Sequence, residues 1–131
     1  MRELIAEDVG RYYLVKAGKD PVLRQNGALE AYEMIYASSG GSEMYHALGA
    51  FESSGDADDQ RELTVGNLRD SGYKIVLDEP LEVGGEPNGG RLTALTNPEG
   101  LGASVWSNGP LFAMTVGPDI SQGRFFRTLP Y

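Results

Sequence analysis

Ala103–Pro118 has the sequence ASVWSNGPLFAMTVGP, in which two apolar runs flank the dipeptide Asn108-Gly109. Asn and Gly tolerate positive φ, so this dipeptide between apolar runs is the strongest short-range signal for a β-hairpin. Pro110 follows directly and has no N–H with which to close a two-residue loop. We therefore expect a four-residue loop over Ser107–Pro110, which pairs Trp106 with Leu111.

The two faces of this hairpin differ in composition, because successive side chains of a strand point to opposite sides. The face that we expect to meet the core comprises Ala103, Val105, Phe112, Met114 and Val116. The opposite face comprises Ser104, Trp106, Leu111, Ala113 and Thr115, and it carries the only Trp of the chain. The second face is therefore only half polar.

The composition indicates one folded domain, which we place at residues 1–131. Apolar residues make up 40% of the chain, and the 18 Gly and 7 Pro predict many turns. The net charge of −8 argues against nucleic acid and anionic membrane surfaces, since both recruit basic patches. No apolar run approaches the roughly 20 residues of a membrane span. We expect no direct membrane insertion and a soluble domain, either cytoplasmic or excised from an extracytoplasmic protein.

The first half of the chain contains one ambiguous segment. Strand formers are concentrated in Arg11–Lys16, and Asp20-Pro21 is typical of a short helix that ends at Asn26-Gly27. The composition of Ala28–Ala37 favours a helix, whereas its alternation allows a strand, which is our prediction.

The other elements follow from apolar spacing and turn residues. We expect strands over Glu43–Phe51, Tyr73–Leu77 and Arg91–Thr96, helices over Ala57–Asp70 and Asp119–Leu129, and a loop over Asp78–Gly90. The simplest α+β architecture has two layers: an antiparallel sheet of five or six strands with helices packed on one face. Ala28–Asp70 and Ala103–Leu129 would then form a pseudo-repeat of strand, strand and helix. Several strands are apolar on both faces, so the sheet either curls strongly or packs its second face on something.

One face of the expected sheet gathers aromatic, Met and His side chains. A loop over Ser38–Ser42 pairs Tyr36 with Met44 and Met34 with His46. The candidate binding residues on this face are Tyr32, Tyr36, Met44, His46 and Trp106. Such residues are enriched at protein interfaces and in ligand grooves. The alternative is that a second layer of the same chain covers them as core.

Few groups in the sequence suit catalysis or a cofactor. His46 is the only His and the chain has no Cys, so we expect neither a zinc site nor a disulfide. Gly84-Gly85 and Gly89-Gly90 match neither the dinucleotide fingerprint nor the P-loop, so we expect no cofactor.

The helix expected over Ala57–Asp70 begins in an acidic cluster. Asp56, Asp58 and Asp59 do not have the spacing of an EF-hand calcium loop, and they suit a helix N-terminus, whose dipole they complement. Further along, we expect Ala57, Arg61, Val65 and Leu68 to lie roughly on one face of the helix.

Five segments resemble small bacterial α+β domains of unknown function: Ala47–Phe51, SSGDAD at Ser53–Asp58, SGYKIV at Ser71–Val76, VWSNGPLFAMTVG at Val105–Gly117 and FFRTLPY at Phe125–Tyr131. Such domains often lie outside the cytoplasmic membrane, as soluble parts of lipoproteins or anchored proteins. The resemblance adds an extracytoplasmic location to the alternatives without deciding between them, and it carries over no catalytic residue.

We predict a non-enzymatic binding or protein-interaction module. Its partner would be another protein, or a second copy of the chain that meets the face of Tyr32, Tyr36, Met44, His46 and Trp106. The alternative is a small enzyme with an internal cavity, an isomerase or hydrolase, in which His46 or a buried carboxylate acts as base and a Tyr as acid.

Overall fold

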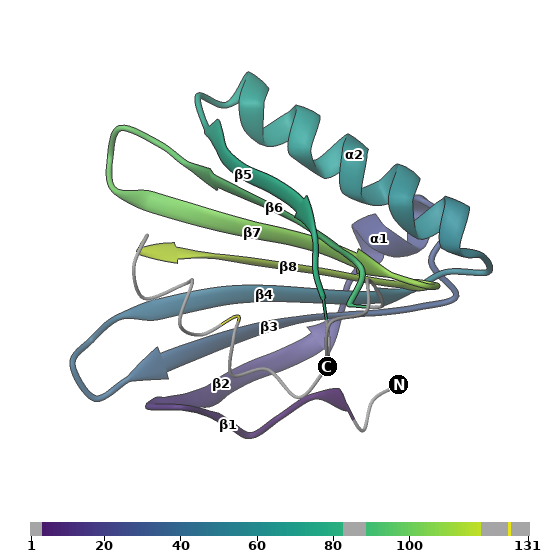
Figure 1. Cartoon of the computed structure of the whole chain (residues 1–131). Helices are drawn as coiled ribbons and strands as arrows, with labels where there is room; N and C mark the ends of the chain where they lie inside the picture. Colours follow the sequence, from purple (N-terminus) through teal and green to yellow (C-terminus); the bar gives the residue numbers. More distant parts are fainter. Residues whose placement is uncertain (1–3, 83–88, 119–125, 127–131) are drawn as a thin grey trace.

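The computed structural model describes residues 4–82, 89–118 and 126, which form one antiparallel sheet with two helices (Figure 1). The strands are β1 (Asp8–Val9), β2 (Tyr12–Lys19), β3 (Glu30–Ser38), β4 (Glu43–Ala50), β5 (Lys74–Pro80), β6 (Arg91–Thr96), β7 (Leu101–Asn108) and β8 (Leu111–Pro118). The helices are α1 (Pro21–Gln25) and α2 (Ser54–Asp70). The strand order is β1-β2-β3-β4-β8-β7-β6-β5, so the last strand joins the two halves of the chain at the centre.

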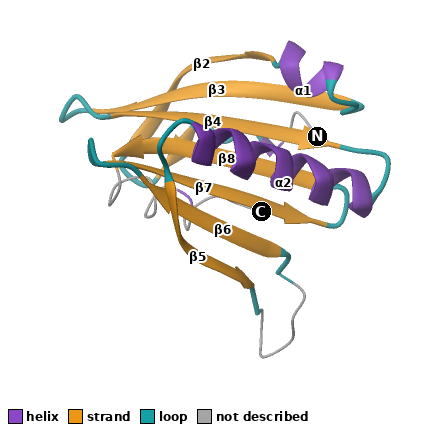
Figure 2. Ribbon diagram, turned by 90° about the horizontal axis from the view of Figure 1, so that it is seen from above, coloured by secondary structure: helices purple, strands orange, loops and turns teal. Residues whose placement is uncertain are grey.

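Helix α2 lies across one face of the sheet, over β7 and β8 and alongside β5 (Figure 2). Ala57 of α2 and Leu23 of α1 belong to the same buried cluster as the sheet side chains beneath them. The sheet contributes Ala31, Ala47, Leu95, Ala103, Val105 and Phe112 to this first core. The hairpin face that the sequence assigned to the core lies here.

The opposite face of the sheet carries a second core. Its buried side chains are Val9, Tyr12, Met34, Tyr36, Met44, Leu48, Trp106 and Ala113. Leu4, Ile5 and Ala6 pack against this cluster from the N-terminal segment, and Phe126 packs against it from the far end of the chain. Apolar strands on both faces are thus explained by two cores on one sheet.

The register between β3 and β4 is as predicted. Tyr36 pairs with Met44, Met34 with His46 and Tyr32 with Leu48. Ala28–Ala37 was the ambiguous segment, and nearly all of it lies in β3. The alternation of its side chains fixes the register, because a slip of one residue would move every side chain to the opposite face of the sheet and so to the other core.

The register between β7 and β8 differs from the prediction by two residues. Trp106 pairs with Ala113 and Asn108 with Leu111, so the turn is Gly109-Pro110 rather than a loop over Ser107–Pro110. Gly109 has φ 55, the positive φ that the first central residue of a type II′ turn requires. Pro110 occupies the second central position, where the missing N–H is not needed for pairing. A shift by an even number leaves every side chain on its predicted face.

The number of strands was underestimated, because the sheet has eight and not five or six. Strand β1 has only two residues, too few to leave an alternating pattern in the sequence. Strand β5 continues to Pro80, into the segment expected to be a loop. The helix expected over Asp119–Leu129, the last element of the second unit of the pseudo-repeat, lies outside the described residues apart from Phe126.

Side-chain caps set where both helices begin. Asp20 is the N-cap of α1 and accepts hydrogen bonds from the N–H groups of Val22 and Leu23, as the Asp-Pro signature predicted. Helix α2 begins at Ser54 and not at Ala57, because the side chain of Ser53 accepts from the N–H of Asp56 and so caps an earlier turn. Neither helix of the described chain is long and apolar enough to cross a membrane.

Substituting Ala for two glycines should change the free energy of unfolding in opposite directions. Gly109→Ala forces a positive φ of 55 on an L residue, which costs about 1–3 kcal/mol. Gly66 lies inside α2, where an added Cβ meets no atom within 4 Å, and Ala is favoured over Gly in a helix by about 1 kcal/mol. Urea denaturation should show G109A to be less stable and G66A more stable than the natural chain, and shifts of equal sign would contradict this description.

Candidate functional site

The five binding residues suggested by the sequence lie together, but in the interior. Tyr36, Met44 and Trp106 belong to the second core, and Tyr32 packs against it half-buried. His46 lies between Met44 and Leu48 on β4 and is 0% exposed. The face expected to be a surface for a partner is therefore largely covered by the chain itself.

Polar tips on this face also bind parts of the same chain. The indole Nε1 of Trp106 donates to the carbonyl of Gly89 at 2.9 Å, and the ring meets Phe126 edge-on with centroids 6.4 Å apart. The hydroxyl of Tyr36 donates to the carbonyl of Ala6 at 2.7 Å. The large aromatic residues thus hold the covering segments in place.

His46 is an interior histidine. Its Nδ1 lies 2.9 Å from Oγ1 of Thr115 on the neighbouring strand β8. Burial lowers the pKa of His46 to about 4, and a hydrogen bond to the backbone of Met114 acts in the opposite direction. The ring is neutral at pH 7, so one nitrogen donates and the other accepts.

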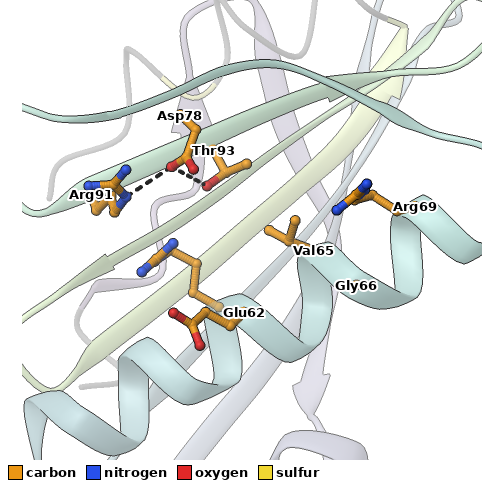
Figure 3. A pocket seen from close by; sticks show the side chains of 8 residues that line it. Glu62, Val65, Gly66, Arg69, Asp78, Arg91 and Thr93 are labelled. Carbon is orange, nitrogen blue, oxygen red and sulfur yellow. Dashed lines mark hydrogen bonds and ion pairs between the residues drawn. The ribbon is translucent and has the colours of Figure 1, made fainter.

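A polar groove runs between α2 and strands β5 and β6, with a cavity volume of about 450 Å³ (Figure 3). Helix α2 contributes Arg61, Glu62, Val65, Gly66 and Arg69, and the strands contribute Asp78, Arg91 and Thr93. We call this the arginine groove. Its walls hold three arginines and two acidic residues, in a chain whose net charge is −8.

Arg61 is the buried arginine of this groove, since it is only 7% exposed. Its Nε donates to Oγ of Ser107 at 3.0 Å, and that hydroxyl donates in turn to Oδ1 of Asp58 at 2.7 Å. The terminal nitrogens of Arg61 bind no described residue. Every fully buried side-chain nitrogen or oxygen of the described chain has a hydrogen-bond partner, so these terminal nitrogens are not fully buried. The tip of the guanidinium group therefore remains accessible, and it is accessible from the groove.

The sheet side of the groove is an internally satisfied pair. Oδ1 of Asp78 accepts from Nε of Arg91 at 2.9 Å and from the hydroxyl of Thr93 at 3.1 Å. The hydrogen bond from Arg91 lowers the pKa of Asp78 most, Thr93 and the charges of Arg91 and Arg61 also lower it, and burial opposes them. Asp78 is thus ionised at neutral pH and compensates Arg91.

The helix side of the groove is not compensated in this way. The side chain of Arg69 forms no hydrogen bond or ion pair with any described residue, and it lies one turn beyond Val65 along the groove (Figure 3). The helix side of the groove therefore presents two guanidinium groups with free terminal donors, Arg61 rooted in the interior and Arg69 at the surface.

The sequence contained a signal for Arg61 that was not recognised as a site. The helical spacing placed Arg61 on one face of the helix with Ala57, Val65 and Leu68, which are apolar. A buried charge needs partners, but those partners, Ser107 and the distant groove wall, come from strands that only the fold brings near.

The stability of the protein should fall between about pH 6.5 and pH 4 because of His46. The unfolded chain takes up a proton on this residue near its usual pKa of 6.5, whereas the folded chain does so near pH 4. The difference destabilises the folded state by about 3 kcal/mol once both pKa values are passed. Urea midpoints measured across this range should therefore decline.

His46→Gln is the matched variant, because it retains a polar side chain for Thr115 but removes the titration. Its profile should be flatter than that of the natural chain between pH 4 and 6.5, whatever its stability at pH 7. Parallel profiles would show that His46 does not stay neutral in the folded chain.

Comparison with protein-family models, with curated proteins and with solved structures gives no match to this chain.

Proposed function

We propose that this domain is a binding module for a small anionic ligand, a carboxylate or a phosphate, held in the arginine groove. The observation that carries this proposal is Arg61, which is almost wholly buried but keeps its terminal nitrogens free on the groove side. A buried charge is costly unless it is paired. A ligand with two oxygen atoms would supply that pair.

The chemistry of the groove favours an anion with several oxygen atoms. Guanidinium groups present parallel N–H donors that match carboxylate and phosphate oxygens in pairs. Arg61 and Arg69 both come from α2, and Arg91 faces them from β6 while bound to Asp78. The negative charges of Asp78 and Glu62 limit how much anionic charge the groove accepts, which favours a small ligand over a polyanion.

Two earlier hypotheses have less support. Self-association through Tyr32, Tyr36, Met44, His46 and Trp106 would require side chains that are largely covered by the same chain. An enzyme based on His46 would require a cavity beside its ring, and His46 lines neither the arginine groove nor the pocket on the other side of α2.

Titration with inorganic phosphate and with succinate, followed by amide NMR shifts, tests the proposal. We expect shifts along the groove, at Glu62, Gly66 and Thr93. Arg69→Gln and Arg61→Lys should each weaken binding about tenfold or more, because a hydrogen bond to a charged group contributes about 1.5–3 kcal/mol. Arg69 is exposed, so its variant should fold normally.

Arg11→Gln is the control, because it makes the same change of charge in the exposed turn before β2. It should leave the affinity within about twofold of the natural value, as expected for a distant screened charge. If Arg11→Gln and Arg69→Gln lowered the affinity equally, the anions would be attracted only by the net charge of the protein and not by the groove. Absence of shifts with both phosphate and succinate would overturn the proposal.

A further inference from the structure

A second pocket lies on the opposite side of α2 from the arginine groove, with a volume of about 320 Å³. It is open to solvent and bounded by α1, α2 and strands β3, β4 and β8, and we call it the acidic pocket. Leu23, Ala47, Leu68, Phe112 and Met114 provide apolar walls. A largely apolar pocket with a few convergent polar groups is the usual form of a small-molecule site.

The polar groups of this pocket are acidic or neutral. Asp20 and Glu33 are among its lining residues, and none of those residues is Lys or Arg. The hydroxyl of Tyr45 donates to Oε2 of Glu33 at 3.2 Å. Burial raises the pKa of Tyr45 most, and the charges of Asp20 and Glu33 raise it further. The negative charges of both carboxylates therefore act on the hydroxyl of Tyr45.

Two oxygens of nearly buried side chains lack a partner here. Asp20 is 4% exposed, and its Oδ1 accepts from the N–H groups of Val22 and Leu23 while its Oδ2 binds no described residue. Gln60 is 7% exposed, and its Nε2 donates to Thr64 while its Oε1 is unbound. No fully buried side-chain oxygen of the described chain lacks a partner, so these two unbound oxygens are exposed to solvent. Both residues line the acidic pocket, and we infer that the oxygens are accessible from it.

We propose that the acidic pocket binds a protonated primary amine that carries a compact apolar group. An ammonium group has three N–H donors and no acceptor, which suits the free oxygens of Asp20 and Gln60 and the carboxylate of Glu33. The apolar group would lie against Phe112 and Met114. The proposal does not depend on the arginine groove, whose ligand has the opposite charge.

Benzylamine, benzyl alcohol and benzoate test the charge requirement, since they differ mainly in the polar group. We expect benzylammonium to shift the amide signals of Leu23, Asn26 and Asn67 and to leave those of Glu62 and Gly66 unchanged. Benzyl alcohol should bind with an affinity at least about tenfold lower than that of benzylammonium, because charge-assisted hydrogen bonds are roughly twice as strong as neutral ones. Benzoate should not bind there.

Asp20→Asn and Glu33→Gln test the residues. Asn is as good an N-cap as Asp, so the first variant removes the charge and keeps α1 capped. Each variant should weaken benzylammonium binding about tenfold, a difference of about 1.4 kcal/mol. Glu99→Gln, in the exposed turn before β7, is the control and should have no effect. Equal binding of benzyl alcohol, unchanged affinity in both pocket variants, or no binding of benzylammonium would each overturn the proposal.

Discussion

Burial of apolar side chains on both faces of a single sheet is the constraint on which the structure depends. Strand β4 illustrates it, since Tyr45 and Ala47 point to the first core while Met44 and Leu48 point to the second. Helix α2 covers only one of these faces. Residues 4–6 and Phe126 pack on the other, and the hydrogen bond from Tyr36 to Ala6 ties the N-terminal segment to it.

The attachment of α2 to the sheet is unusual in its chemistry. The buried residues of this helix are Ala57, Gln60, Arg61 and Thr64, so three of the four are polar. Small or polar side chains bury little apolar area and contribute correspondingly little hydrophobic free energy. The hydrogen bond from Arg61 to Ser107 of β7 must therefore help to hold the helix to the sheet, whereas the hydrogen bond from Gln60 to Thr64 lies within the helix. Arg61 and Gln60 each leave polar atoms accessible on one side of the helix.

Local patterns were sufficient for much of the fold. Alternation identified β3 and placed the hairpin side chains on the correct faces, and the Asp-Pro pair located α1. The turn at Gly109-Pro110 was missed because the predicted and observed registers differ by two residues. A shift of two residues keeps every side chain on the same face, so the composition of the faces does not distinguish the two turns. Neither pocket could be predicted. Arg61 and Asp78, or Asp20 and Gln60, are distant in sequence and meet only after strands have paired across both halves.

The proposal of an anionic ligand gives the burial of Arg61 an explanation that docking of α2 does not supply. For docking of α2, a Met or Leu at this position would bury more apolar surface without desolvating a charge, and replacements of this kind are often neutral or stabilising. Asp58 offsets the charge only through the hydroxyl of Ser107, and Asp78 is already bound to Arg91. The terminal donors therefore form no hydrogen bond with a described residue, and Asp78 acts on Arg61 only through its charge. Gln60 presents the same problem on the opposite flank, where its free oxygen faces a pocket with no Lys or Arg in its lining. Polar groups that weaken the docking of a helix and open into cavities on both sides of it are accounted for if those cavities are occupied.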